Sequence, residues 1–255
     1  MNDRSITRTE IAALAGGSPI LEVEGLRAGY GRAEIVHGLD LLVGRGQSLC
    51  LIGPNGAGKS TVLHALFGFA NVFGGAVRVA GADVTRLKAS RKLAQAGIAY
   101  VLQDNSVFPD LTVEENLLMG GYLLPGARAA RAAAERAFDR YDRLARRRRE
   151  RAGVLSGGER RLLEIARALV MDPAILLIDE PSIGLEPRYI ELVFETLGAL
   201  KAKDGKTIVM VEQNAKKGLA FADIGYVLVA GRLAKAGRGP ALLADPEIGR
   251  LFLGG

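Results

Sequence analysis

The sequence contains no tryptophan, one cysteine and two histidines, and none of its apolar runs approaches the ~18 residues of a membrane-spanning helix. A single cysteine, Cys50, cannot form an internal disulfide, and this sparing use fits a reducing compartment. His37 and His64 are too isolated to form a metal site. The charged residues near the N-terminus argue against a signal peptide. These absences exclude a disulfide scaffold, a histidine-rich metal site and a membrane-spanning chain.

The charge of the chain is concentrated in one segment. Of 255 residues, 49% are hydrophobic, enough for one sizeable core, and the formal net charge is +6. Residues 127–151 hold ten arginines against four acids, so this segment alone carries +6. We interpret it as a solvated helix with ion pairs four residues apart. Attraction to anionic lipid headgroups is a second hypothesis. Nucleic-acid binding is least favoured, because the segment is not patterned with aromatics that stack on bases. The expected ion pairs are Arg131–Glu135, Asp139–Arg143 and Asp142–Arg146.

A glycine-rich segment lies between the apolar run 47–52, which predicts a buried strand, and a stretch of helical periodicity at 61–69. This spacing, G-x-x-x-x-G-K-[ST] between a strand and a helix, is typical of a phosphate site. Its glycines let backbone N–H groups converge on phosphate oxygens at a helix N-terminus. A turn that binds nothing is the alternative, which the context disfavours. The segment, called the cradle below, reads Gly53-Pro54-Asn55-Gly56-Ala57-Gly58-Lys59-Ser60.

Each polar group of the cradle has an expected partner on a nucleoside triphosphate. We expect Lys59 to reach the β- and γ-phosphates, and Thr61, directly after the cradle, to support the α-phosphate. The Ser60 hydroxyl is expected to ligate Mg²⁺. The cradle therefore predicts ATP and Mg²⁺ as cofactors.

Three more apolar runs end in polar side chains. Residues 174–178 precede Asp179 and Glu180, residues 98–102 precede Gln103, and residues 207–211 lead to Gln213. An acid that closes a buried strand lies at the carboxyl edge of a parallel sheet, where nucleotides bind. Asp179 is the expected Mg²⁺ partner, and Glu180 can polarise the attacking water as a general base. The two amides could bind phosphate, metal or water, although each alone could be an ordinary loop residue.

Residues 155–159 read Leu-Ser-Gly-Gly-Glu and are called the signature below. Ser156 and Glu159 have the spacing of a capping box, so a helix is expected to begin here and offer a second anion site. A plain helix cap accounts for these two residues but not for Gly157 and Gly158 between them. One chain thus carries two phosphate-facing helix ends about a hundred residues apart.

With the signature, the order of motifs resembles the nucleotide-binding subunits of ABC transporters, from about residue 21 to residue 253. The resemblance implies that Tyr30 stacks on adenine and that Gln103 touches Mg²⁺ and senses a transmembrane partner. It implies catalytic roles for Glu180, Lys59 and Gln213, and a contact of the signature with the ATP of a second subunit. Metal contacts are expected from Ser60, Gln103 and Asp179. The residues expected to bind ATP are Tyr30, Gly53, Pro54, Asn55, Gly56, Ala57, Gly58, Lys59, Ser60, Thr61, Gln103, Ser156, Gly157, Gly158 and Glu159.

Two positions depart from the general family pattern. Gln213 stands where a switch histidine is usual, and Glu186 stands where an aspartate is usual. A glutamine can donate a hydrogen bond to γ-phosphate but carries no titrating proton. Residues 211–215, 223–228 and 242–246 are similar to one ATP-binding subunit of branched-chain amino-acid importers.

Strands that alternate with helices predict a doubly wound α/β fold. The resemblance specifies a P-loop NTPase (RecA-like) core with an antiparallel β subdomain and a helical signature subdomain. We expect residues 1–18 to be a disordered extension and residues 19–255 to form a single ATPase domain. Its core is expected at about 19–103 and 160–255, and its helical subdomain at about 104–159.

The resemblance also implies the setting in which the chain works. The expected partners are a second ATPase subunit, identical or paralogous, two transmembrane permease subunits and, indirectly, a periplasmic solute-binding protein. The expected location is the cytoplasmic face of the inner membrane, as a peripheral subunit. Branched-chain amino-acid import is the favoured function, and urea or amide import, lipid or glycolipid export and a non-transport regulatory ATPase remain alternatives.

Overall fold

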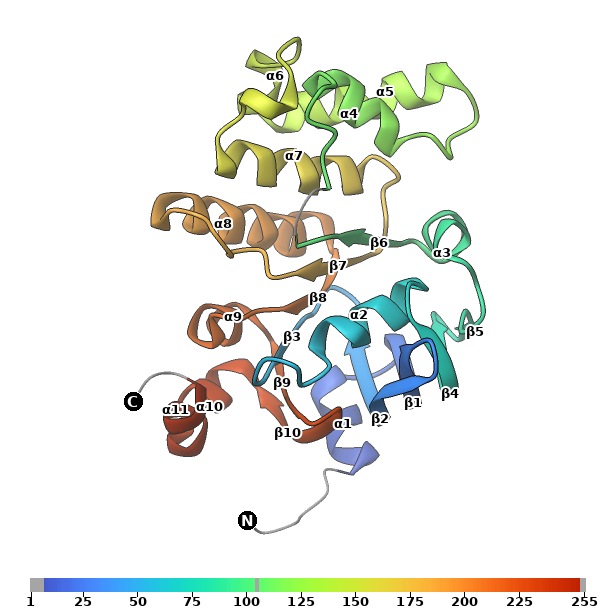
Figure 1. The fold of residues 1–255 in the computed structure, drawn as a ribbon, viewed down its shortest axis with the longest axis vertical. Coiled ribbons are helices and arrows are strands. Elements are labelled where there is room, and N and C mark those ends of the chain that lie inside the picture. The colour runs from blue at the N-terminus through green and yellow to red at the C-terminus, as the bar shows by residue number, and fades with distance from the viewer. Residues whose placement is uncertain (1–6, 104–105, 253–255) are drawn as a thin grey trace.

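The computed structural model describes residues 7–103 and 106–252, which form two β-sheets and surrounding helices (Figure 1). The first sheet is antiparallel, with strand order β2-β1-β4-β5. The second has the order β10-β9-β3-β8-β7-β6, parallel except for β10. The strands are β1 (Pro19–Tyr30), β2 (Ala33–Gly44), β3 (Ser48–Ile52), β4 (Asn71–Val79), β5 (Ala82–Asp83), β6 (Ile98–Val101), β7 (Ile175–Asp179), β8 (Thr207–Val211), β9 (Ile224–Val229) and β10 (Arg232–Arg238).

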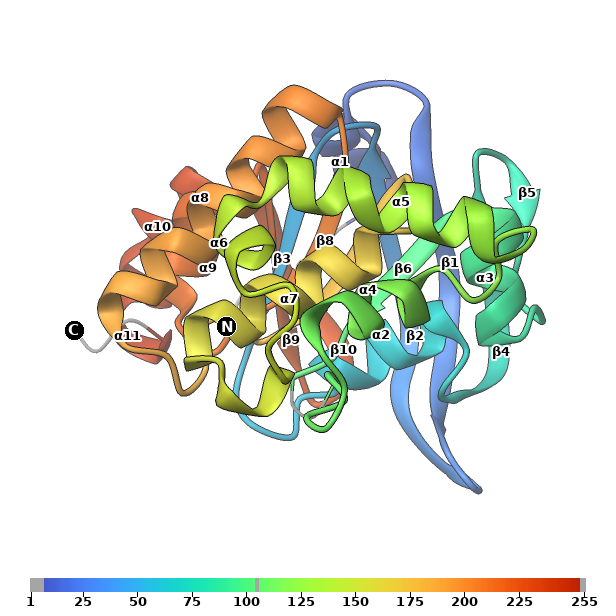
Figure 2. The same ribbon diagram turned by 90° about the horizontal axis from the view of Figure 1, so that it is seen from above.

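The helices form two groups around the second sheet. Helix α2 lies between the two sheets, whereas α8 and α9 cover the other face of the second sheet (Figure 1). Helices α4, α5 and α6 cover α7, as the view from above shows (Figure 2). The helices are α1 (Arg8–Ala15), α2 (Lys59–Phe67), α3 (Ala89–Ala96), α4 (Val113–Gly120), α5 (Ala127–Arg140), α6 (Asp142–Arg146), the 3₁₀ helix η1 (Ala152–Val154), α7 (Gly157–Leu169), α8 (Pro187–Asp204), α9 (Ala215–Phe221), α10 (Gly239–Leu243) and α11 (Pro246–Phe252).

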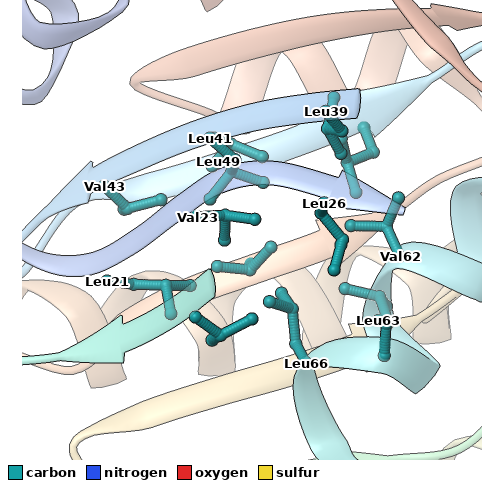
Figure 3. Packing of buried hydrophobic residues seen from close by; sticks show 14 of the residues in the cluster. Leu21, Val23, Leu26, Leu39, Leu41, Val43, Leu49, Val62, Leu63 and Leu66 are labelled. Atoms are coloured by element: carbon teal, nitrogen blue, oxygen red, sulfur yellow. The ribbon is translucent and has the colours of Figure 1, made fainter. Parts of the chain in front are cut away.

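The central strands of the second sheet are buried on both faces. All five residues of β3, β7 and β8 are buried, as expected for parallel strands covered on both sides. Leu49 and Leu51 of β3 join the cluster that includes α2, whereas Cys50 and Ile52 join the cluster under α8 and α9. The first of these clusters is drawn in Figure 3, where side chains of β1, β2 and β3 meet those of α2, among them Leu21, Leu26, Leu39, Leu49, Leu63 and Leu66.

The N-terminal region differs from the expected disordered extension. Residues 8–15 form α1, whose start is fixed by a capping box between Thr7 and Glu10. Ile11 and Ala15 are buried in the core, and Gln47 Nε2 donates a hydrogen bond to the Leu14 carbonyl. Burial of this apolar face against β2 explains why the segment is ordered. Residues 1–6 lie outside the described residues.

Helix α7 joins the expected helical subdomain to the core. The helix runs unbroken from Gly157 to Leu169, so the boundary expected between 159 and 160 falls inside it. The other expected boundary, at Asp104, lies outside the described residues. Thr112 and Glu115 form a capping box that begins α4. No helix within 7–103 and 106–252 is both long enough and apolar enough to cross a membrane.

The ion pairs expected in the arginine-rich segment are not the ones formed among the described residues. Helix α5 ends at Arg140, so the segment does not continue as one helix. Arg148 instead folds back to pair with Glu135 and, at 2.6 Å, with Glu114, while Arg140 pairs with Asp204 of α8. The expected pairing four residues apart was wrong: Asp139–Arg143 spans the end of α5, and Glu135, although it lies in α5 with Arg131, pairs with Arg148 instead.

Lys92 of α3 carries a buried amine whose proton should make stability depend on pH. The side chain is fully buried, and Nζ donates to the carbonyls of Ala65 and Leu66 (3.1 and 2.8 Å) in the last turn of α2. Burial lowers the pKa of Lys92 from 10.5 to about 8, with Asp83 opposing the shift. Between these two values the unfolded chain binds more protons, so the contribution of Lys92 to the free energy of unfolding increases as pH rises.

We therefore expect the difference in unfolding free energy between wild type and Lys92→Met to move in favour of wild type by about 1–3 kcal/mol between pH 7.5 and pH 10. Chemical denaturation at both pH values measures this difference. Parallel pH profiles for the two proteins would show that the amine keeps its ordinary pKa in the fold.

Candidate functional site

The cradle joins the end of β3 to the start of α2 through backbone conformations that require glycine. Gly53 has φ +152°, and a Cβ there would lie 2.1 Å from the Leu228 carbonyl oxygen. Gly56 and Gly58 also have positive φ, +79° and +94°. Lys59 is buried, and its Nζ donates to the carbonyls of Gly53 and Pro54 at 2.9 and 3.0 Å. The two hydrogen bonds thus hold the amine against the cradle loop.

A cavity of about 430 Å³ opens in front of the cradle. The strand-end residues Gln103, Glu180 and Gln213 all line it, so the structure brings together side chains from four separate segments. Ile35 and Ile183 also line the cavity, although neither carries a polar signal that a sequence pattern could reveal. The cradle contributes Asn55, Gly56, Gly58, Lys59 and Ser60, followed by Thr61.

Two carboxylates follow each other at the end of β7 with different surroundings. Asp179 is buried, and it accepts hydrogen bonds from Ser60 Oγ (3.1 Å) and from the Tyr100 hydroxyl (3.0 Å). Glu180 reaches the cavity, and its Oε2 accepts a hydrogen bond from Gln103 Nε2 at 3.1 Å. The main chain of Glu180 has φ +44°, in the left-handed region that non-glycine residues rarely adopt.

Burial shifts the pKa values of Lys59 and Tyr100 in opposite directions. Burial lowers the pKa of Lys59, and the negative charges of Glu180 and Asp179 oppose this shift. Burial and the charge of Asp179 raise the pKa of Tyr100. Its hydroxyl therefore stays protonated and donates a hydrogen bond to the Asp179 carboxylate. Tyr100 was not identified from the sequence, because it is one apolar-looking position within a strand.

The signature begins α7 as expected but lies apart from the cradle cavity. Ser156 and Glu159 form a complete capping box, with Ser156 accepting from the Glu159 amide at 3.3 Å. The other oxygen of Glu159 binds Arg147 Nε at 2.9 Å, a partner that no sequence pattern indicated. Gly157 lines a second cavity of about 160 Å³, which shares Gln103 and Ile183 with the cradle cavity. The signature residues themselves do not line the cradle cavity.

Packing against α8 requires glycine at the second glycine position of the signature, Gly158. A Cβ on Gly158 would lie 2.0 Å from Cδ1 of the Tyr189 ring on α8, closer than any real contact.

We expect Gly158→Ala to lower the free energy of unfolding by about 1–3 kcal/mol, because the ring must move. The matched control is Gly198→Ala in α8, where nothing lies within 4 Å of the added methyl. Denaturant unfolding should show this control to be about 0.5–1 kcal/mol more stable than wild type. Equal effects of the two substitutions would contradict the packing argument.

The remaining sequence-predicted residues occupy varied places. Tyr30 does not line the cradle cavity; it is 41% exposed, and its hydroxyl contacts His64 Nδ1 of α2. The His64 ring also packs edge-to-face on Tyr100, with 5.7 Å between ring centroids. Glu186 is the residue before α8, and it pairs with Arg188 at 3.1 Å. Pro54 and Ala57 shape the cradle through a backbone hydrogen bond of 3.1 Å rather than lining the cavity.

The oxygen donors at the cavity suit a hard cation shared with a ligand. Ser60 Oγ and Asp179 Oδ1 are neighbours at 3.1 Å, and the amide of Gln103 lies in the same cavity. Among the described residues there is no group of three or more His, Cys, Asp or Glu side chains that could hold a metal ion. A cation here would therefore have to take most of its ligands from phosphate oxygens and water, which is how proteins usually bind Mg²⁺.

Comparison with known proteins places the chain among transport ATPases. A family model described as ABC transporter matches residues 36–183. The chain is 40% identical over 226 residues to the high-affinity branched-chain amino acid transport ATP-binding protein BraG of Pseudomonas aeruginosa, covering 89% of this chain and 96% of that relative. It is 36% identical to the probable branched-chain amino acid transport ATP-binding protein LivF of Archaeoglobus fulgidus, covering 90% and 96%.

An export protein and several solved structures are also similar. The Nod factor export ATP-binding protein I of Ralstonia nicotianae is 38% identical, covering 92% of this chain and 71% of that relative. The crystal structure of a nucleotide-free ATP-binding cassette from an ABC transporter matches with a TM-score of 0.81 and 28% identity, covering 92% of this chain and 99% of that one. An ADP-bound cassette of an ABC transporter matches with a TM-score of 0.80 and 29% identity, covering 93% and 100%. These matches confirm the P-loop fold expected from the sequence.

Proposed function

The chain belongs to the ABC transporter family and is an ATP-hydrolysing subunit of a transporter, and we propose that this transporter imports branched-chain amino acids. The observation that carries this proposal is the share of each relative's length that aligns with this chain. The chain spans 96% of BraG and of LivF but only 71% of the Nod factor export protein of Ralstonia. The two importer ATPases therefore match over most of both partners, 89–90% of this chain and 96% of each relative.

The test is uptake of radiolabelled leucine, isoleucine and valine by cells that lack this chain. Uptake should fall to background and return when the wild-type chain is restored. Competition with unlabelled urea and short amides tests the alternative importers. Undiminished uptake of all three amino acids, together with loss of an exported lipid or glycolipid, would favour the export function of the Nod-factor relatives instead.

In the proposed mechanism the cradle binds the phosphates and its neighbours prepare hydrolysis. The Lys59 amine, now held on the carbonyls of Gly53 and Pro54, can turn to the β- and γ-phosphates without leaving the cavity. Ser60, Asp179 and Gln103 would hold Mg²⁺, which neutralises charge on the phosphates when bound. Thr61 lines the same cavity and would support the α-phosphate.

Glu180 is proposed to act as the general base for the attacking water. Its carboxylate lines the cavity and is oriented by the Gln103 amide, so it stands where a water can approach the γ-phosphate. Gln213, two residues after the end of β8, lines the same cavity and would donate a hydrogen bond to γ-phosphate. Most of the catalytic effect then comes from positioning and charge neutralisation.

A second subunit is proposed to complete each ATP site. The signature does not line the cradle cavity of its own chain, and it begins helix α7, whose N-terminus favours an anion. Two chains packed head to tail would bring each signature to the other's ATP. The partner is a second copy of this chain or a related ATPase subunit.

The permease is proposed to dock over an apolar hollow beside the site. A cavity of about 260 Å³ there is lined by Tyr100, Phe108, Met119 and Tyr122, among others. Phe108, Met119 and Tyr122 are 47%, 45% and 65% exposed, although large apolar side chains are usually covered. Part of its lining, Ser106, Phe108, Met119, Gly120 and Tyr122, follows Gln103, the residue expected to sense a transmembrane partner. We propose docking at the cytoplasmic face, with a periplasmic protein delivering solute to the two permeases.

We expect the double variant Phe108→Ala, Tyr122→Ala to lose co-purification with the permease, because a permease helix would no longer find this apolar surface. Its affinity for ATP should stay within about twofold of wild type. The matched control is Val229→Ala, which removes an apolar side chain that is 43% exposed on β9. Normal recovery of the permease with the double variant would move the docking surface elsewhere.

A further inference from the structure

One buried arginine binds the main chain at both strand ends that lead to the hydrolysis site. Arg161 of α7 is 5% exposed. Its Nη2 donates to the carbonyls of Asp179 and Glu180 at 3.0 and 2.9 Å, and its Nε donates to that of Pro181 at 3.2 Å. Its Nη1 donates to the carbonyl of Leu102 at 2.7 Å. In the sequence the residue is only a polar position in the helical periodicity after the signature.

The partners of Arg161 flank the two residues that meet at the cavity. Leu102 directly precedes Gln103, and Glu180 itself accepts one of the bonds through its main chain. The side chains of Gln103 and Glu180 are joined to each other at 3.1 Å. A planar guanidinium offers five N–H donors in a fixed fork, which is why one side chain can hold four carbonyls in a set arrangement.

The charge of Arg161 is compensated within the same helix. Glu164 binds Nη1 at 2.7 Å, and both side chains are almost fully buried. A buried ion pair of this kind is a poor device for stability alone, because removal from water offsets most of the attraction. The four carbonyl bonds, rather than the ion pair, explain what the arginine accomplishes here.

We propose that Arg161 is a positioning residue for ATP hydrolysis, which ties the signature helix to Glu180 and Gln103 of the same chain. The proposal rests on the proposed function, in which Glu180 is the base. Glu180 has φ +44°, a conformation that persists only where its surroundings impose it. Arg161 imposes this conformation, because it donates hydrogen bonds to the carbonyls of Asp179, Glu180 and Pro181. Because Arg161 lies five residues after Ser156 on one rigid helix, a displacement of the signature by the partner's ATP would displace the hydrolysis site.

The test compares Arg161→Lys and Arg161→Gln with wild type in the full-length protein. Lysine keeps the charge next to Glu164 but lacks the fork, and glutamine keeps only one donor group. We expect ATP affinity, measured by equilibrium titration, to stay within about threefold in both. We expect kcat at saturating ATP to fall about tenfold in Arg161→Lys and more in Arg161→Gln. Amide hydrogen exchange should become faster in residues 180–185.

Lys92→Met is the control for a general loss of stability. It also removes a buried cation bound to main-chain carbonyls, but on α3, away from the carboxylates. We expect it to lower stability without changing kcat per folded molecule or exchange in residues 180–185. A kcat in both Arg161 variants equal to that of an active wild type would overturn this role of Arg161. A wild-type protein without ATPase activity would instead refute the proposed function, and with it this role.

Discussion

Replacement of Glu180 by glutamine is expected to lower kcat for ATP hydrolysis at least about a hundredfold and to leave ATP bound between two closed subunits. Glutamine preserves the size of the side chain and its place beside Gln103, but it cannot accept a proton from the attacking water. Binding and closure need only the cradle and the signature, so they should survive. Size-exclusion chromatography with ATP and Mg²⁺ would then reveal a stable dimer that wild type forms only transiently.

The matched control for Glu180 is Glu191→Gln, on the exposed side of α8. Glu191 pairs with Lys217 and has no place in the cradle cavity. This control should hydrolyse ATP as wild type does. The paralogous subunit must be included, because closure can require it. A Glu180→Gln protein that stays monomeric with saturating ATP and that paralogue present would refute the closure mechanism.

Lys59→Ala is expected to weaken ATP binding about a hundredfold or more. The amine is the only cation among the described residues that line the cavity, so its loss removes the side-chain charge that they offer to the β- and γ-phosphates. It also removes the hydrogen bonds that hold the Gly53 and Pro54 carbonyls. Equilibrium titration with a fluorescent ATP analogue measures the effect directly.

An exposed lysine provides the comparison for Lys59. Lys217→Ala also removes one positive charge, but from the surface of α9, where Lys217 pairs with Glu191. ATP affinity should change little in this variant. Affinity retained in Lys59→Ala would mean that the cradle binds nucleotide through its backbone alone, or that it is not the nucleotide site.

Features with a local signal could be predicted from the sequence. The strands before the cradle and before Asp179 read as apolar runs because both of their faces are buried. The capping box at Ser156 was predicted correctly because it is completed within four residues. The same signal is present at Thr7 and Glu10, and it could have indicated α1 in the segment that we expected to be disordered.

Contacts between distant segments could not be predicted in this way. Arg161 binds carbonyls at the ends of two strands, those of Leu102 and Asp179. Arg147 pairs with Glu159 across the turn before α7. The contact between Tyr30 and His64 joins β1 to α2. The ion pairs of the arginine-rich segment join Arg148 to Glu114 of α4 and Arg140 to Asp204 of α8, residues far apart in the sequence. Such contacts follow from the three-dimensional arrangement and leave no fixed spacing in the sequence.

At Glu180, whose backbone is left-handed, thermal stability and ATP hydrolysis favour different residues. Glycine adopts φ +44° without the penalty of about 1 kcal/mol or more that other residues incur there, so Glu180→Gly should fold at least as well as wild type. The same change removes the carboxylate. A laboratory selection for heat resistance alone would therefore enrich variants that are lost when growth depends on nutrient uptake. At this position, the residue that suits the fold best is one that natural selection cannot keep.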